Sequence, residues 1–467
     1  MPACRPAAQK NILVRLSVLL LILLLTLTAA ACTSASALAE QDRTDSTAPG
    51  AKPSPETEET PETGAEPAWT KAEPVEIASV YLRIGKTYSR DYYIPGTIEI
   101  VDPSGKYSLE RTDIELKVRG NSTSYAEKKP FNVRFAEKTE LFGLGSAKKW
   151  CLMANCFDKT LIRNKLAYDL ASDVGMPYVS QSVFVDLYVG GAYYGNYLLC
   201  ESVGVGKDRV NLDEQGNEFL LERIPSATGY DTGYSFVTPR YQLRFTLNGP
   251  TDPNEEQIAY LNEFISTFED AVRYGQWSDV EEICDVDSFA DFYVINELFK
   301  SVDFPSGSTR FYIKEGKIYA GPLWDMDLAM GNASEAYYHY NNLDSSGDSA
   351  EGFYCRSCWM DGLFRFRQFR VMVYQSLLRM QPQIVNLTTD NELGMNRIDR
   401  LVTMYGDSFA RNYISKRDGG AGWQLTTVYS TLERIPDETY EENVEFLRSW
   451  LIRRNAWLLG ILKEEKM

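Results

Sequence analysis

The sequence predicts an α+β fold with a β-rich N-terminal lobe at 77–250 and a mainly helical C-terminal lobe at 251–467. Two observations predict it. From Val75 onward, apolar residues alternate with period two in short segments separated by Gly, Asn, Asp or Pro turns, which is the pattern of strands. Beyond residue 250, apolar residues recur at helical spacing in long segments. A chain of 467 residues can bury a sizeable core in two such lobes.

The first lobe is expected to consist mainly of strands. They are expected at 75–84, 91–102, 108–120, 129–137, 150–156, 182–191 and 193–202. One helix is expected at 160–173, because Leu161, Leu166 and Leu170 recur at helical spacing and Gly175 follows as a stop. The last two strands are joined by a Gly-rich turn, which predicts a hairpin.

The second lobe is expected to be helical. Helices are expected at 255–275, 287–301, 362–380 and 442–462. The aromatic residues Phe364, Phe366 and Phe369 are interpreted as part of the core rather than as a cofactor site.

The N-terminus has the features of an export signal. Basic residues precede an apolar run and a small-residue cleavage zone, so residues 1–31 are excluded from the fold. The Ala-Ala-Ala-Cys sequence that ends at Cys32 resembles a bacterial lipobox, although Ala29 stands where Leu is more usual. We therefore expect an exported protein, lipid-anchored through Cys32 on the extracytoplasmic face of the membrane, with a plain secreted protein or an uncleaved signal anchor as alternatives. The acidic, Pro/Ser/Thr-rich segment 32–76 is expected to be a disordered linker.

Charge and composition exclude some functions. The formal net charge of -17 argues against nucleic acid as a partner and favours a basic one, and it requires any nucleotide site to be locally basic. The chain has one histidine, His339, so a His-rich zinc site is excluded. His339 itself either contacts substrate or is a loop residue.

The cysteines beyond the N-terminus leave several pairings open. Outside the cytoplasm, Cys151 with Cys156 and Cys355 with Cys358 could each close a local disulfide. The second pair could instead be half of a zinc site or a redox pair, although no second CxxC and no βαβ pattern supports either.

Residues 291–332 carry the strongest chemical signal. A helix leads into a loop with Asp303, two short strands follow, and a turn then holds Asp325 and Asp327. Because side chains alternate along an extended segment, Asp325 and Asp327 are expected on the same side, where they can share Mg²⁺. Asp303 is then free to orient a hydroxyl, as phosphoryl transfer requires. The alternative is a loop Asp and two turn Asps without a catalytic role.

A basic turn in the first lobe complements these carboxylates. The segment 119–124, RGNSTS, offers backbone N–H groups and hydroxyls to phosphate oxygens, and Lys128 or Lys129 on the next segment supplies positive charge. The alternative is a surface hairpin with ordinary lysines. Arg163 is expected either to contact phosphates or to brace the acidic site, and Glu201 either to accept a hydrogen bond from a nucleotide base or to pair with a lysine.

Together, the motifs RGNSTS…KKPFNVRF, KKWCLMANCFDKTLIRNKLAYDLA, YGNYLLCE and NELFKSVD…STRFYI…GPLWDMDLAMGN resemble the CotH family of bacterial spore-coat proteins. The resemblance covers roughly residues 77–460, with the motifs in the same order. It implies a highly diverged, two-lobe protein-kinase-like fold that uses ATP and Mg²⁺ to phosphorylate Ser-rich proteins.

Carried over by position, the resemblance makes Asp303 the catalytic aspartate and Asp325 a metal ligand, with Asp327 as a second ligand or its support. It assigns nucleotide binding to basic and acidic residues of the first lobe: Arg119, Lys128 or Lys129, Arg163 and Glu201. The predicted function is an atypical Ser/Thr kinase whose partners are a nucleotide, a Ser/Thr-rich and basic protein acceptor, and the membrane. Two alternatives are a surface lipoprotein that binds without catalysis and a polymer hydrolase with paired carboxylates.

Overall fold

The computed structural model describes residues 71–85, 87–225, 233–304, 306–333, 349–353, 358–424 and 439–465. Residues Gly64–Met467 form one compact unit. The predicted export signal, most of the predicted linker, and the residues Cys32, His339 and Cys355 lie outside the described ranges, so the predictions that fall on them stay predictions.

Seven strands of the N-terminal half form a closed barrel in the order β1-β2-β3-β4-β5-β7-β6. Their bounds are β1 Ser79–Ile84, β2 Ile94–Val101, β3 Leu109–Val118, β4 Phe131–Glu140, β5 Ser146–Met153, β6 Ser182–Val189 and β7 Ala192–Glu201. All neighbours are antiparallel except β1 and β6, which pair in parallel and close the barrel. Closure leaves no strand edge exposed.

The apolar residues that alternate with period two in the sequence fill the interior of this barrel. Leu116, Val133 and Leu152 are buried within it, and the residues that alternate with them, such as Lys117, lie on the outer face. The outer face of β3, β4 and β5 is therefore polar, and it forms one wall of the candidate site.

A second sheet has the order β12-β11-β8-β10-β9. Its strands are β8 Phe219–Arg223, β9 Ser235–Val237, β10 Arg244–Gly249, β11 Thr309–Lys314 and β12 Lys317–Ala320. Strands β8 to β10 precede residue 250, whereas β11 and β12 follow it. The sheet thus crosses the boundary that the sequence predicted between the lobes. The reason is that β11 pairs with β8 over nearly ninety residues of chain, a contact that local patterns do not reveal.

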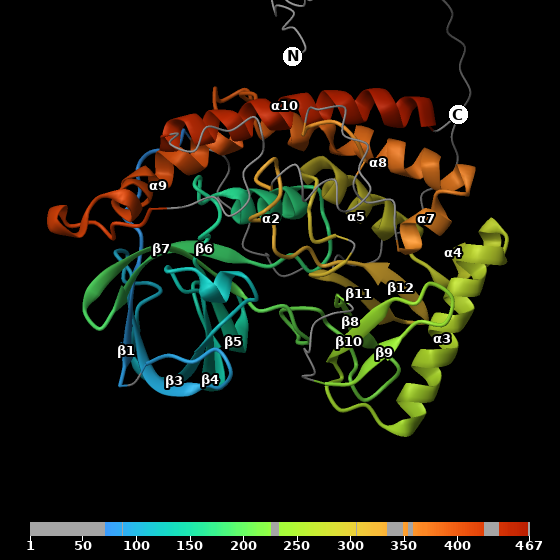
Figure 1. The fold of residues 1–467 in the computed structure, drawn as a ribbon, viewed down its shortest axis with the longest axis horizontal. Helices are drawn as coiled ribbons and strands as arrows, with labels where there is room; N and C mark the ends of the chain where they lie inside the picture. Colours follow the sequence, from blue (N-terminus) through green and yellow to red (C-terminus); the bar gives the residue numbers. More distant parts are fainter. Residues whose placement is uncertain are drawn as a thin grey trace, which may run out of the picture. The chain divides into compact units, whose positions relative to one another are not determined.

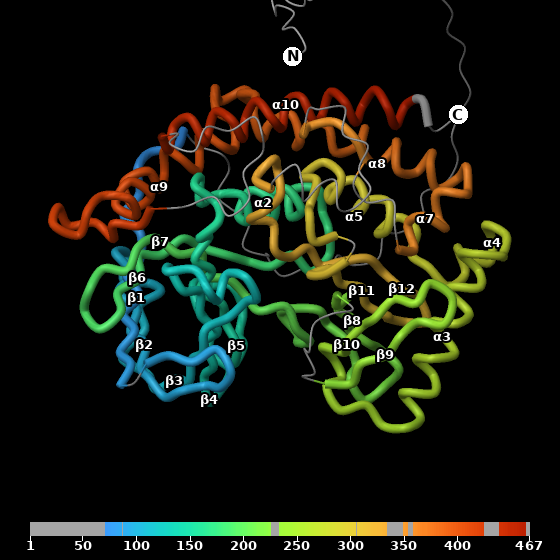
Figure 2. The backbone as a smooth tube through the Cα atoms, in the orientation of Figure 1, coloured from blue at the N-terminus to red at the C-terminus, as the bar shows by residue number. Residues whose placement is uncertain are grey.

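The helices lie mainly in the C-terminal half. They are α2 Arg163–Asp173, α3 Glu255–Tyr274, α4 Trp277–Ile283, α5 Val286–Phe299, α7 Trp359–Leu363, α8 Arg367–Asn386, α9 Arg397–Tyr413 and α10 Tyr440–Glu465, with short 3₁₀ turns at Thr123–Tyr125 and Lys416–Asp418. The start of α3 shows why the sequence folds there, because Asn254 and Gln257 cap it reciprocally. Figures 1 and 2 show α2, α5, α8 and α10 in a layer that runs alongside both sheets.

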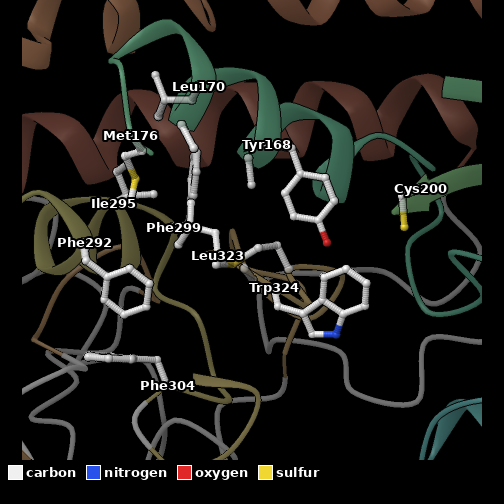
Figure 3. Close-up of a cluster of buried hydrophobic side chains, with 14 of the residues drawn as sticks. Tyr168, Leu170, Met176, Cys200, Phe292, Ile295, Phe299, Phe304, Leu323 and Trp324 are labelled. Carbon is white, nitrogen blue, oxygen red and sulfur yellow. The ribbon is translucent and has the colours of Figure 1, made fainter. Parts of the chain in front are cut away.

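The apolar core runs from the barrel to the helices without a break. Figure 3 shows the part beneath α2, where Leu170, Phe292, Phe299 and Leu323 gather beside Trp324. Trp324 directly precedes Asp325, so the acidic turn is anchored on this core. The predicted order of strands followed by helices is confirmed, and the barrel is a feature that the sequence did not predict.

Candidate functional site

A cleft of about 1020 Å³ lies between the outer face of the barrel and the second sheet. Its lining includes the basic turn from Arg119 to Thr123, the segment from Ser202 to Gly206, and all three predicted carboxylates, Asp303, Asp325 and Asp327. The structure therefore brings together the two motifs that the sequence placed far apart in the chain.

The cleft is basic although the chain is acidic. Nine Lys or Arg residues line it against five Asp or Glu residues, whereas the whole chain carries a net charge of -17. The basic residues are Arg90, Lys117, Arg119, Lys138, Lys148, Lys149, Arg209, Arg223 and Arg310. This local excess is what an acidic protein needs in order to bind an anion.

Two of the three carboxylates share a hydroxyl. The Ser308 Oγ lies 3.2 Å from Oδ2 of Asp303 and 3.3 Å from Oδ2 of Asp325. Asp303 begins a tight turn in which the N–H groups of Ser306 and Gly307 both donate to its carbonyl oxygen. Ser308 was not predicted from the sequence as a site residue. Its position in the same loop, five residues after Asp303, could have indicated a contact with that carboxylate.

Burial and neighbouring charge raise the pKa values of Asp303 and Asp327. Burial and the charge of Asp325 raise the pKa of Asp303 to about 7, against the hydrogen bond from Ser308. Burial, followed by the charges of Asp325 and Asp303, raises the pKa of Asp327 well above its usual range. Carboxylates held together in this way favour a bound proton or a cation.

The acidic turn does not have the extended conformation that the sequence argument assumed. Asp325 has a φ of 64°, in the left-handed region, and no strand includes residues 321–333. Asp is one of the residues that tolerates this conformation. Asp325 and Asp327 line the same cleft because the turn presents both of them there, rather than through strand alternation.

The turn is held from the N-terminal half by two asparagines. The N–H of Met326, between the two aspartates, donates to Oδ1 of Asn164 at 2.7 Å. Asn164 donates in turn to Oδ1 of Asn155 at 3.0 Å. Both asparagines are buried. The position of the acidic turn thus depends on the start of α2.

Arg163 braces the same turn and does not line the cleft. It is fully buried, forms an ion pair with Asp158 at 2.5 Å, and donates to the carbonyl oxygens of Ala329 and Met330. The cofactor-binding role that was predicted for it has no support from this position, because its guanidinium is paired with buried groups of the protein. The bracing role that was the alternative fits these contacts.

The two lysines that were predicted to hold phosphates do not line the cleft. Lys128 is 2% exposed, donates to the carbonyl oxygens of Ala154 and Asn196, and lies 4.7 Å from the ring centroid of Tyr197. Burial lowers its pKa to about 7. Lys129 donates to the carbonyl oxygen of Ser124 and so supports the basic turn from behind.

Arg119 lies in the cleft as predicted, and Arg310 joins it. Their Cζ atoms lie 5.2 Å and 5.3 Å from the ring of Trp324, respectively. Arg310 is tied to Glu222 at 2.9 Å, but its buried Nε has no hydrogen-bond partner within the described part of the chain. Arg310 comes from β11, whose pairing with β8 could not be predicted, and it was missed for that reason.

Glu201 lies outside the cleft. It lines a separate cavity of about 340 Å³ with Gln181 and Arg209. On β7, Glu201 and Cys200 point to opposite faces, and the face of Cys200 is the one that adjoins the cleft. Burial raises the pKa of Glu201 to about 7, against the charge of Arg209 and the hydrogen bond from the Gln181 N–H. Its predicted contact with a nucleotide base therefore has no support from its position.

The donor set of the acidic turn fits a hard cation that also binds a ligand. Among the residues that the structure describes, no three His, Cys, Asp or Glu side chains form a complete metal cluster. Mg²⁺ usually takes only one or two protein carboxylates and completes its shell with water and phosphate oxygens. Asp325 and Asp327 supply that number. Burial, followed by the charges of Asp325 and Asp303, raises the pKa of Asp327, and a bound cation would relieve the repulsion between these charges.

The described helices include none that is long and apolar enough to cross a membrane. The cysteines at 151, 156, 200, 284 and 358 are free thiols. The suggested Cys151–Cys156 disulfide is therefore not formed in this structure.

A basic cleft lies between the barrel and the second sheet, and three carboxylates converge in it. The site is therefore of the class that can bind an anion together with a hard cation. Residues 116–458 match the family model described as CotH kinase protein, so the chain belongs to that family. No curated protein matches the chain. Among solved structures, a Helicobacter pylori proinflammatory kinase, CtkA, is similar over 82% of this chain and 92% of that chain, with 9% identity and a TM-score of 0.30, a likeness that carries no argument here.

Proposed function

We propose that this protein is a Mg²⁺- and ATP-dependent phosphotransferase that phosphorylates Ser or Thr hydroxyls of a protein. Membership of a kinase family supports the general class. The observation that carries the proposal is the convergence of Asp303, Asp325 and Asp327 in one cleft whose remaining lining is basic.

Asp303 is assigned to the acceptor. Its half-buried carboxylate lines the cleft, and burial and Asp325 raise its pKa to about 7. A carboxylate with such a pKa can accept the proton of a hydroxyl near neutral pH. Ser308 fixes the distance between this group and Asp325.

Asp325 and Asp327 are assigned to Mg²⁺. When bound, the cation would neutralise charge on the phosphate oxygens. Arg119 and Arg310 are fixed cations in the same cleft, so they are suited to hold the phosphate chain. The basic turn adds backbone N–H groups at Gly120 to Thr123.

The two-lobe arrangement of a diverged protein kinase is part of this proposal. In it, the barrel takes the place of the first lobe, and the helical layer with the acidic turn takes the place of the second. The cleft between the barrel wall and the second sheet supports that division. It has room for a nucleotide together with an acceptor side chain, because its volume is near the upper end of ordinary ligand sites of about 300–1,000 Å³.

We also propose an exported, lipid-anchored protein and a Ser/Thr-rich acceptor. The apolar N-terminal run and the Cys32 motif support the location. The net charge of -17 supports an acceptor protein with a basic surface, which would bind this chain outside the basic cleft. Such a location requires ATP outside the cytoplasm.

Transfer of labelled phosphate tests the proposal. The full-length chain is incubated with γ-labelled ATP, Mg²⁺ and a Ser/Thr-rich protein, beside D303N and the control D361N, an aspartate that does not line the cleft. Loss of a general base is expected to lower kcat by about 10²- to 10⁴-fold. Equal labelling by wild type and D303N would reject the catalytic assignment. If neither wild type nor the variants transfer phosphate, and the protein binds its partner without ATP, the result would favour a binding protein without catalysis.

A further inference from the structure

We propose that Cys151 and Cys200 form a disulfide-forming thiol pair in the cleft wall, oxidised by a low-molecular-weight disulfide that enters through the cleft. The two residues are exact cross-strand partners on β5 and β7. Neither has a role in the phosphotransfer proposed above.

The backbone geometry meets the requirement for a disulfide. Opposite residues on antiparallel strands have Cα atoms about 4.5 or 5.5 Å apart, depending on the kind of pair. Disulfides form over Cα separations of about 4.4–6.8 Å. Directly opposite side chains also point to the same face of the sheet, so the two sulfur atoms face each other without movement of either strand.

The surroundings give access to one of the two thiols. Cys151 lines the cleft, and its Sγ lies 3.4 Å from Oδ1 of Asn132 on the neighbouring strand. Cys151 is 2% exposed, whereas Cys200 is completely buried and is absent from the cleft lining. Figure 3 shows Cys200 on the same side of the buried cluster as Tyr168 and Trp324. The arrangement therefore places the thiol that reacts first, Cys151, in the lining of the cleft, and the resolving thiol, Cys200, next to it on the neighbouring strand.

The electrostatics agree with these roles. A hydrogen bond from Cys200, together with the charge of Arg119, lowers the pKa of Cys151 to about 6 against the effect of burial. Burial raises the pKa of Cys200. The lowered pKa of Cys151 favours its thiolate, which is the reactive form of a cysteine.

The reaction has two exchange steps. The Cys151 thiolate attacks one sulfur of the small disulfide, forms a mixed disulfide and releases one small thiolate. Cys200 then loses its proton and attacks Sγ of Cys151, which releases the second small thiolate. Overall, the protein dithiol is oxidised to a disulfide, and the small disulfide is reduced to two thiols.

Cys284 and Cys156 are poor candidates for such a pair. Cys284 is buried, pairs with Ile318 in an isolated β-bridge, and has a pKa that burial raises. Cys156 lies in the loop after β5, and burial followed by the charge of Asp327 raises its pKa to about 12. Cys284 therefore provides a matched control, because it is a buried thiol outside the cleft.

The test exposes the full-length chain in detergent to oxidised glutathione, alkylates the remaining thiols, and maps linked peptides by mass spectrometry. We expect a Cys151–Cys200 peptide in wild type and in C284S. In C200S we expect Cys151 to carry one glutathionyl group instead. Linkage of Cys151 to another cysteine, or failure of wild type to form any link, would overturn the proposal.

A second arm tests access through the cleft and rests on the proposed function. Mg²⁺-ATP at saturation is expected to slow formation of the link at least fivefold, and thiol reaction at Cys284 should not change. An unchanged rate in a sample that binds ATP by calorimetry would contradict access through the cleft. An unchanged rate in a sample that does not bind ATP would instead reject the nucleotide site and leave the thiol pair to be judged by the peptide map.

Discussion

Asp303 and Asp325 are bridged by the hydroxyl of Ser308, at 3.2 Å and 3.3 Å. A hydroxyl has a single proton, so it can donate to only one of the two carboxylates at a time. The other carboxylate must find a proton, a cation or a substrate hydroxyl. The bridge therefore couples the residue assigned to the acceptor to the residue assigned to the metal.

Replacement of Ser308 by Ala tests this coupling. We expect S308A to lower kcat about tenfold, because Asp303 loses the group that fixes its position, with little change in the KM for ATP. Steady-state kinetics measure both values. S306A is the matched control, because Ser306 also lines the cleft but its hydroxyl donates to the backbone carbonyl of Asp303 rather than to a carboxylate. An equal loss of kcat in both variants would contradict a specific role for the bridge.

The roles of Arg119 and Lys128 can be distinguished by the effect of their substitution on ATP affinity. R119M is expected to weaken ATP binding at least tenfold, because Arg119 lines the cleft beside the acidic turn. K128M should change the affinity by less than about threefold, because Lys128 is buried among carbonyl oxygens. Titration calorimetry on folded samples measures both. A larger loss in K128M than in R119M would restore Lys128 as the phosphate ligand.

The ion pair between Arg163 and Asp158 is predicted to stabilise the fold around the acidic turn. Removal of one partner of a fully buried pair leaves an uncompensated charge, so R163M should lower the free energy of unfolding by about 3–5 kcal/mol. R111M breaks an exposed pair with Glu99 and should cost about 0–1 kcal/mol. Urea unfolding measures both. Similar losses in the two variants would show that the buried pair has no special weight.

Glu201 should make stability depend on pH. Its folded pKa of about 7 lies above the ordinary value of 4.5, so the native state binds more protons than the unfolded state between these values. Its stabilising contribution is full below about pH 4.5 and is lost as pH rises through about 7, at a cost of about 3 kcal/mol by 1.4 kcal/mol per pKa unit.

The variant E201Q is expected to remove that dependence. Between pH 5 and pH 7.5, the free energy of unfolding of the wild type should fall relative to that of E201Q, as measured by urea unfolding at both values. E214Q is the control, because Glu214 is a carboxylate that lines the cleft rather than the cavity of Glu201. A constant difference between wild type and E201Q at the two pH values would contradict the raised pKa.

The carboxylates of the site were predictable because their signals are local. Asp303, Asp325 and Asp327 stand in loops at the ends of elements whose periodicity is clear in the sequence, and all three line the cleft. Arg119 was predictable for the same reason, since it ends a strand and begins a polar turn.

The positions of Lys128 and Arg163, which do not support their predicted roles, are set by contacts with residues that are distant in sequence. The carbonyl partners of Lys128, at Ala154 and Asn196, are distant in sequence, and so are the partners of Arg163 at Ala329 and Met330. Nothing local distinguishes a buried cation of this kind from one that faces a cleft. The barrel and the β8–β11 pairing were missed for the same reason, because closure and long-range register are properties of the whole chain.

Titration calorimetry of the full-length chain with ATP, with and without Mg²⁺, is the most direct test of Mg²⁺-dependent ATP binding in the cleft. We predict binding that requires Mg²⁺, that D325N abolishes, and that D303N leaves nearly intact, because Asp325 is assigned to the metal and Asp303 to the acceptor hydroxyl. Binding that ignores Mg²⁺ and survives D325N, or no binding by folded wild-type protein in any condition, would contradict it.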